Sequence, residues 1–310
     1  MKNSYEFSWW YFDCILDNKM KLVVIFYDHP YFLSFEKGLM DVLIYQNGEK
    51  RYFSSSDLSP KCKFQKEPLY LTISSNQLLK TDSGYLLDIN VKGLMIKLKL
   101  GITYNYWKPF TIPLYHNKNY YFHWKVYAPS LNVKGIMLIQ GEKINVKGEG
   151  YLDSNEGNLV FSKFLNSWVW GRIFRSNRTV IFGSLNFNDK SIFQPVLICD
   201  HKDSHYFNLT YPIIFDEEKL QFRDSNFSDV FYIEDQDRID TVELLISKIP
   251  QSWKFARQIH EIIFYGLERF NFGKHLNKVM ANFKYERFSA NLVDSDRNKY
   301  QSVLETIHFR

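Results

Sequence analysis

The sequence predicts an all-β protein of antiparallel strands, and three features predict it. Short alternating or apolar runs, broken by Gly, Asn, Asp and Ser, recur along most of the 310 residues. Aromatic residues make up 18% of the chain, which favours β-structure, a hydrophobic ligand cavity, or both. The runs follow no fixed period, which disfavours propellers and solenoids. A meander of this kind predicts a barrel or a sandwich.

In the first half of the chain each expected strand ends at a turn signal. Residues 21–27 and 41–45 are apolar, and the second run is closed by Gln46-Asn47-Gly48. Residues 85–91 and 94–100 flank Lys92-Gly93, which is typical of a hairpin. The other strands expected here are residues 51–53, 69–74 and 77–80.

The second half begins after a loop expected to hold Pro109 and Pro113. Its expected strands are residues 120–126, 133–139, 144–151, 167–173, 179–186, 191–199, 220–222 and 241–249. Apolar residues then recur at helical spacing, which predicts a few C-terminal helices. These are expected at residues 251–267, 273–283 and 297–307.

Composition excludes several classes of protein. The net charge of +5 is mild and spread along the chain, without basic blocks or recognition motifs, so nucleic acid is not an expected partner. Three distant cysteines indicate neither a disulfide framework nor a thiolate metal site, and no metal is expected. We expect a cytoplasmic protein without a signal peptide or membrane-spanning helix, with loose membrane contact permitted by a lipid-soluble ligand. Nucleophile-elbow, P-loop and dinucleotide motifs are not found.

Three segments, in order, resemble the carotenoid 1,2-hydratase family and its relatives, which include AttH-like proteins and Diels–Alder cyclases. Residues 8–27 (SWWYFDCILDNKMKLVVIFY) resemble the family's Trp-Trp-Tyr-Phe-Asp strand and the strand after it. Residues 122–157 resemble its His-Trp strand and its Gly-x-Gly-Tyr-His-Asp-His-Asn-Trp-Gly signature. Residues 168–173 (WVWGRI) resemble its Trp-x-Trp-Gly-Arg element.

The resemblance implies two lipocalin-like antiparallel β-barrel domains, which we expect at residues 1–165 and 166–310, with the active site at their interior and interface. It also implies that Tyr151 and Asp153, with His123 and Trp124, correspond to the family's acid centre. His123 and Trp124 are adjacent, so they are expected on opposite faces of a strand. The chain departs from the signature at three positions, where the family has His, His and Trp: Leu152, Ser154 and Glu156.

The expected chemistry follows from strand geometry. Tyr151, Asp153 and Asn155 share one face of a strand. In an aromatic pocket the pKa of a carboxyl rises, so Asp153 could protonate an alkene as a general acid. Aromatic faces stabilise the resulting cation by roughly 0.5–2 kcal/mol each. The rings expected to do so belong to Trp124, Trp168 and Trp170.

Each of these residues also has a purely structural interpretation. Asp153 could accept backbone hydrogen bonds at a strand end, Tyr151 could tie down a loop, and the tryptophans could be core residues. Arg172, assigned with the tryptophans to substrate binding, needs a partner if it is buried. If that partner is Asp153 or Glu156, the pKa of the carboxyl falls. The segment 200–205 (DHKDSH) is expected to be a solvated loop rather than a metal site.

Three functions remain open at this point. The first is a cofactor-independent enzyme that protonates an isoprenoid or polyene, ending in cyclisation or hydration. The second is a Diels–Alderase-type pericyclase whose cavity orients a polyene, an effect worth roughly 7–11 kcal/mol. The third is a carrier that holds a hydrophobic ligand without turnover.

Overall fold

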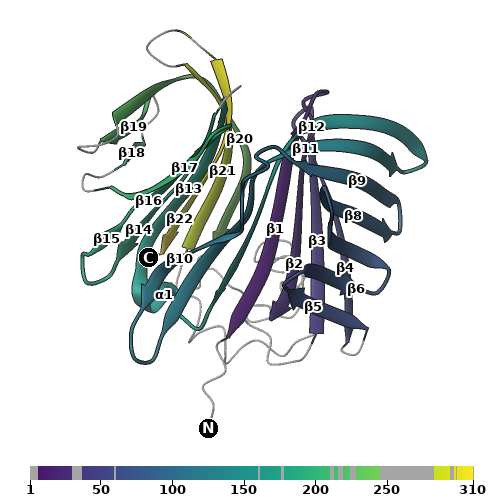
Figure 1. Ribbon diagram of the computed structural model, residues 1–310, viewed down its shortest axis with the longest axis horizontal. Coiled ribbons are helices and arrows are strands. Elements are labelled where there is room, and N and C mark those ends of the chain that lie inside the picture. Colours follow the sequence, from purple (N-terminus) through teal and green to yellow (C-terminus); the bar gives the residue numbers. More distant parts are fainter. Residues whose placement is uncertain are drawn as a thin grey trace. The chain divides into compact units, whose positions relative to one another are not determined.

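The computed structural model describes residues 6–29, 37–58, 61–159, 161–175, 178–209, 213–215, 219–223, 228–244, 283–293, 297 and 299–309. The chain divides into two compact units, Met1–Leu159 and Val160–Arg310. Each unit is built on one sheet, called here sheet A and sheet B (Figure 1). The strand pairings are antiparallel, which confirms the all-β prediction.

Sheet A has twelve strands and forms a nearly closed barrel, in which β5, β6, β8 and β9 run across the direction of β1, β2 and β3 (Figure 1). The strand order is β4-β3-β2-β1-β12-β11-β9-β8-β7-β6-β5, and β10 pairs with β11. Their bounds are β1 Phe7–Leu16, β2 Lys21–His29, β3 Lys37–Gln46, β4 Glu49–Leu58, β5 Cys62–Lys66, β6 Leu69–Ile73, β7 Asn76–Thr81, β8 Gly84–Val91, β9 Leu94–Ile102, β10 Phe110–His116, β11 Tyr121–Ile139 and β12 Glu142–Gly157.

Side chains bridge the two edges of sheet A. Cys62 Sγ, at the start of β5, donates to the Asp57 carbonyl of β4 at 3.4 Å. Ser74 Oγ, just after β6, donates to Asp57 Oδ2 at 2.7 Å. These contacts hold the edge strands together where the backbone ladder is not continued.

The interior of this unit is a packed apolar core. Alternate residues of each strand point into it, because successive side chains of a strand face opposite sides of the sheet. From β1 the core takes Trp10, Phe12, Cys14 and Leu16, all at most 2% exposed. The other residues of β1 therefore point to the opposite face of the sheet, which becomes important below.

Two hairpin turns explain why a glycine follows Asn47 and Gln140 in the sequence. Asn47 and Gly48 both have positive φ, 53° and 78°, as the two-residue turn between β3 and β4 requires. Gln140 and Gly141 do the same between β11 and β12, at 52° and 93°. The predicted turns at Asn47-Gly48 and Lys92-Gly93 are confirmed.

The structure corrects two expectations around proline. Residues 120–126 and 133–139 are not separate strands, because β11 runs through both with irregularities in its pairing to β12 between Val126 and Leu131. Pro129 lies in this irregular stretch, where a missing N–H is tolerated. Pro113, expected in a loop, lies in β10, which pairs with β11 alone.

The carbonyl of Tyr127, at the first irregularity of β11, accepts two side-chain hydrogen bonds. Trp107 Nε1 donates to it at 3.0 Å and the Tyr85 hydroxyl donates at 3.3 Å. A backbone group released from the ladder is therefore still paired, as buried polar groups require. These two hydrogen bonds hold the irregularity in place directly after residues 121–126, the part of β11 that contains His123 and Trp124.

Sheet B has ten strands, in the order β17-β16-β14-β13-β22-β21-β20-β19-β18, with β15 paired to β14. Its core cluster includes Ile173, Phe182 and Leu304. The bounds are β13 Leu165–Arg175, β14 Arg178–Phe187, β15 Ile192–Phe193, β16 Pro195–Asp200, β17 Ser204–Asn208, β18 Ile214–Phe215, β19 Lys219–Arg223, β20 Ser228–Leu244, β21 Phe283–Val293 and β22 Lys299–Phe309. The described part of this unit also includes a short helix, α1 Phe161–Phe164.

The helix expected at residues 297–307 is wrong, because Lys299–Phe309 is β22, paired with β13 and β21. Both faces of this strand are buried, as Val303 and Leu304 show at 5% and 0% exposed. A strand buried on both faces lacks the polar alternation that identifies strands from sequence. The helices expected at 251–267 and 273–283 lie outside the described residues, apart from Phe283, which begins β21.

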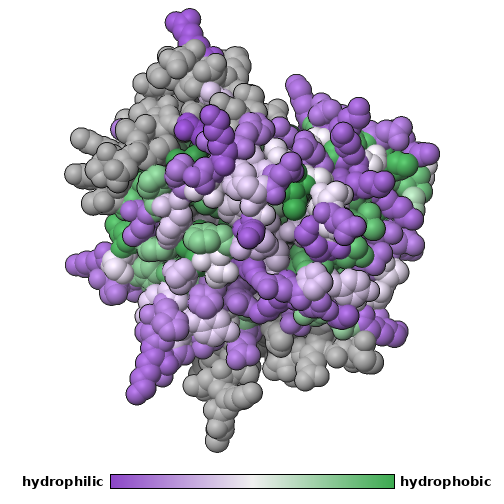
Figure 2. All heavy atoms as spheres, in the orientation of Figure 1, coloured by the Kyte–Doolittle hydropathy of each residue, from purple (hydrophilic) through white to green (hydrophobic). Residues whose placement is uncertain are grey.

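On the face shown in Figure 2, hydrophobic residues appear in scattered patches among hydrophilic ones. Within the described ranges, no helix is long and apolar enough to cross a membrane.

The close approach of β1 and β12 predicts the effect of a glycine substitution. A Cβ added at Gly148 would lie 2.1 Å from the Ile15 carbonyl oxygen, so Gly148→Ala forces two central strands apart. We expect a loss of about 1–3 kcal/mol in unfolding free energy, measured by urea denaturation. Gly101→Ala is the matched control, because its Cβ would meet nothing nearer than 3.8 Å. Equal midpoints for the two variants would contradict this reading of the packing.

Candidate functional site

The candidate site lies on the face of sheet A that points away from the apolar core. Tyr11 pairs with Asp153 across β1 and β12, and Asp13 pairs with Tyr151. Directly opposed residues share a face, so these four side chains project together. Leu152, between the two residues of β12, belongs to the core on the other side.

Hydrogen bonds join the residues expected to form the acid centre. The Tyr151 hydroxyl donates to Asp153 Oδ2 at 2.8 Å. The indole Nε1 of Trp124, on β11, lies 2.8 Å from the same oxygen and 3.1 Å from the Tyr151 hydroxyl. Asn155 Nδ2 lies 3.5 Å from Asp153 Oδ1. Asp153 is only 3% exposed and Tyr151 is fully buried.

Sequence reasoning missed a second tyrosine–aspartate motif beside the first. The Tyr11 hydroxyl donates to Asp13 Oδ2 at 2.9 Å, and Asp13 is 2% exposed. Residues 11–13 and 151–153 therefore repeat the pattern Tyr-x-Asp on two antiparallel neighbours. We call these four residues the paired Tyr–Asp motif. The repeated pattern was visible in the sequence, but only the register of β1 against β12 shows that the two copies face each other.

The environment of Tyr151 keeps its hydroxyl protonated. Burial raises the pKa of Tyr151 well above its usual range, and the charge of Asp153 and its hydrogen bond raise that pKa further, whereas the hydrogen bond with Trp124 lowers it. At neutral pH Tyr151 is therefore a donor to Asp153 rather than a base.

A third buried carboxyl, which sequence reasoning also missed, lies on the same face. Asp41 of β3 is 1% exposed, and Tyr52 of β4 donates to its Oδ1 at 2.7 Å. Burial raises the pKa of Asp41 well above its usual range, and hydrogen bonds with Tyr52 and Tyr27 lower it by less. A lone Asp in an apolar strand carries no sequence signal for this arrangement.

Three further aromatic rings lie on the same face, toward the start of β1 and the end of β12. The Phe7 ring stacks on Trp9 with 5.1 Å between centroids, and it meets Phe122 edge-on at 5.8 Å. Gly157, the last residue of the signature, lies opposite both Phe7 and Phe122. A Cβ there would lie 2.8 Å from the Phe7 ring, so the glycine gives the rings room.

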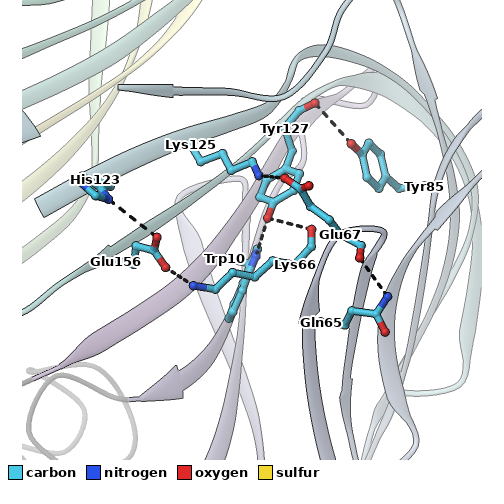
Figure 3. Close-up of polar contacts among 9 residues, drawn as sticks. All are labelled: Trp10, Gln65, Lys66, Glu67, Tyr85, His123, Lys125, Tyr127 and Glu156. Atoms are coloured by element: carbon cyan, nitrogen blue, oxygen red, sulfur yellow. Dashed lines mark hydrogen bonds and ion pairs between the residues drawn. The ribbon is translucent and has the colours of Figure 1, made fainter. Parts of the chain in front are cut away.

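His123 lies on the other face of the sheet, as its adjacency to Trp124 predicted. It pairs with Glu156 across β11 and β12, with 3.9 Å between its Nδ1 and Glu156 Oε1 (Figure 3). Glu156 also forms an ion pair with Lys66 (Figure 3). The structure therefore places His123 in a partly exposed polar cluster apart from Asp153.

The three departures from the family signature all fall on that other face. Leu152 is in the apolar core, Ser154 lies opposite Trp10 of the core, and Glu156 is paired with Lys66. The face of β12 that carries Tyr151, Asp153 and Asn155 keeps the signature residues. The departures therefore change the packing side of the strand and leave the hydrogen bonds among Trp124, Tyr151 and Asp153 in place.

The remaining candidates belong to the second unit. Trp168, Trp170 and Arg172 share the face of β13 opposite Ile173, which is in the core of that unit. Trp170 and Arg172 are buried, at 6% and 0% exposed. The guanidinium of Arg172 lies over the Phe174 ring, 4.0 Å from its centroid.

The segment 200–205 forms the turn between β16 and β17. Asp200 Oδ1 accepts the backbone N–H groups of Lys202 and Asp203, at 2.7 and 3.0 Å. These bonds lower the pKa of Asp200. Among the residues that the structure describes, no three His, Cys, Asp or Glu side chains are grouped so that they could hold a metal ion.

Fold and site together define an all-β protein with a buried Trp–Tyr–Asp cluster on one face of a nearly closed sheet. The family model for the carotenoid hydratase CrtC matches residues 40–212, more than half of the chain. The chain belongs to this family. The matched range contains Trp124, Tyr151 and Asp153. A comparison with curated proteins finds no match.

Solved structures share the fold at low sequence identity. An AttH-like protein of Nitrosomonas europaea is 11% identical, with a TM-score of 0.62 over 100% of this chain and 95% of the other. Kievitone hydratase of Nectria haematococca is 13% identical, with a TM-score of 0.55 over 97% and 88%. CghA, crystallised with Sch210972, is 8% identical, with a TM-score of 0.62 over 98% and 88%.

The raised pKa of Asp41 predicts a specific dependence of stability on pH. The stabilising effect of its bound proton is fully present below the pKa of an unfolded Asp, about 3.9, and is lost as the pH rises toward the folded pKa. Asp41→Asn cannot ionise, so as the pH rises from about 4 toward the folded pKa of Asp41 its unfolding free energy should fall less than that of the wild type. Denaturant titrations across this range measure the difference. The exposed Asp82→Asn should follow the wild type, and parallel curves for wild type and Asp41→Asn would refute the prediction.

Proposed function

We propose that the protein is a cofactor-independent enzyme that protonates a C=C bond of an isoprenoid or polyene, leading to cyclisation or hydration. The observation that carries the proposal is the buried hydrogen-bonded cluster of Trp124, Tyr151 and Asp153. Membership of the carotenoid hydratase family supports the choice of an alkene as the reacting group.

The geometry favours Asp153 as the proton donor. Its burial disfavours the charged form of the carboxyl, whereas donors on Oδ2 favour it. Because Trp124 and Tyr151 both donate to Oδ2, the proton of the neutral acid belongs on Oδ1. Asn155 lies beside Oδ1, and its own buried Oδ1 has no hydrogen-bond partner among the described residues. If the Asn155 amide rotates by 180°, its oxygen can accept a hydrogen bond from the protonated Oδ1 of Asp153 until the proton is transferred.

Proton transfer from Asp153 to the alkene forms one bond and breaks one bond. The alkene π electrons form the new C–H bond, the Oδ1–H bond of Asp153 breaks, and a tertiary carbocation and a carboxylate result. Tyr151 and Trp124 then stabilise the carboxylate, because their donors already point at it. Nearby aromatic faces contribute roughly 0.5–2 kcal/mol each to the cation. The ring proposed for this in the first unit is that of Trp124.

Asp13 supplies the base that completes the cycle. Attack by an internal alkene gives a ring, and capture by water gives a hydroxyl, but in either case a proton must leave. The Asp13 carboxylate faces Tyr151 across the strands and accepts from Tyr11. The Tyr11 and Tyr151 hydroxyls can pass this proton back to Asp153, which restores the acid.

Replacement of the acid should abolish turnover. Asp153→Asn keeps the shape of the side chain but removes its acidic proton, so we expect product formation from an acyclic carotenoid in detergent to fall by about 10²–10⁴-fold. Binding, followed by tryptophan fluorescence, should persist. Glu156→Gln is the matched control, since it removes a carboxylate from the opposite face of the same strand.

Other outcomes separate the competing functions. A pericyclase keeps its activity in Asp153→Asn, and a carrier binds the ligand without turnover in the wild type. Product formed in ¹⁸O-labelled water carries the label after hydration and lacks it after cyclisation.

Replacement of the base should have a smaller effect than loss of the acid. We expect Asp13→Asn to lower turnover by about 10²-fold, because deprotonation must then proceed without a positioned base. Tyr11→Phe keeps this carboxylate and breaks only the return path, so steady-state turnover should fall while the first turnover stays fast. Rapid-quench kinetics distinguish the two, and a normal steady-state rate in Asp13→Asn would exclude it as the base.

A further inference from the structure

The proposed reaction leaves the buried Asp41 unused. Tyr52 donates to its Oδ1, and the Tyr27 hydroxyl also acts on this carboxyl. Its Oδ2 is nevertheless fully buried and has no partner with hydrogen-bond geometry among the described residues. A buried polar atom without a partner costs free energy, so such an atom indicates a ligand group that completes it. Asp41 is a side chain of this kind on the face that carries the paired Tyr–Asp motif.

Asp41 lies in the same cross-strand row as the acid. Asp41 pairs with Ile25, Ile25 lies beside Tyr11, and Tyr11 pairs with Asp153. The row crosses three strand spacings, so the backbones of the two aspartates are about 14 Å apart. Both carboxyls are buried, yet Ile25 between them is partly exposed. An apolar residue more accessible than the acids on either side suggests that space above it receives an apolar chain.

We propose that Asp41, held by Tyr52, binds an uncharged oxygen, a hydroxyl or a carbonyl, at the far end of the substrate whose alkene lies at Asp153. The residues registered beside Asp41 favour a neutral partner. Its neighbours across the strands are Ile25 and Ser54, and neither brings a positive charge to bind an anionic end group. A desolvated anion there would be costly. The substrate that fits this arrangement is therefore an isoprenoid with a neutral oxygen at that end, rather than one that ends in a phosphate ester.

This inference rests on the proposed function, but it is tested by binding alone. The probes are farnesol, its hydrocarbon counterpart farnesene, and farnesoic acid, titrated against the tryptophan fluorescence of the full-length protein. We expect farnesol to bind about five- to tenfold more tightly than farnesene, the value of one neutral hydrogen bond, and farnesoic acid to bind more weakly than farnesol. Equal affinities, or no binding of either neutral probe, overturn the proposal.

Variants locate the preference. Asp41→Asn retains a donor and should keep most of the preference for farnesol, whereas Asp41→Leu should lose it and bind both neutral probes equally. Asp153→Asn should keep the preference, so a failure of the acid proposal is distinguishable from a failure of this one. If Asp41→Leu still prefers farnesol over farnesene, the assignment of Asp41 as the oxygen-binding residue is wrong.

Infrared difference spectra keep the test independent of whether Asp41→Leu folds. In the wild type, farnesol should shift the C=O stretching band of a protonated carboxyl, and farnesene should not. The shifted band should be missing in Asp41→Asn. A farnesol-induced shift that persists in Asp41→Asn assigns the contact to another carboxyl and overturns the proposal.

Discussion

The register of β1 against β12 is the constraint on which the site depends. Strand side chains alternate between faces, so a slip of one residue would carry Tyr151 and Asp153 into the apolar core and bring Leu152 out. The packed core on one side and the hydrogen-bonded carboxyls on the other enforce the same register. Burial of polar groups is tolerated here because each carboxyl meets a tyrosine hydroxyl from its own or an adjacent strand.

The two faces of β12 also show how a family signature can change on one side of a strand and stay the same on the other. In this chain Leu152 packs in the apolar core and Glu156 forms an ion pair, so local packing and charge account for these residue types. Positions 151, 153 and 155 share the opposite face. Membership of the carotenoid hydratase family is therefore compatible with the differences in the signature, because they lie on one face of the strand alone.

Much of the fold was predictable from local signals, whereas contacts between distant strands were not. Asn47-Gly48 and Lys92-Gly93 indicate hairpins, because tight turns need positive φ angles and Asn and Gly adopt these most readily. β22 was misread as a helix because both of its faces are buried. The resemblance predicts Asp153 and Tyr151 as candidate site residues. It does not predict Asp13 and Asp41, because only the pairing of the strands shows that these two carboxyls lie on the same face as Asp153.

The paired Tyr–Asp motif has a local two-fold relation, because two identical tripeptide patterns run in opposite directions beside each other. By itself such symmetry would make its two acids interchangeable. The sheet order breaks it: β12 is flanked by β11, which brings the indole of Trp124 to Asp153, whereas β1 is flanked by β2. The indole of Trp124 thus makes the surroundings of Asp153 and Asp13 unequal. In the proposed reaction, this difference decides which of the two aspartates donates the proton.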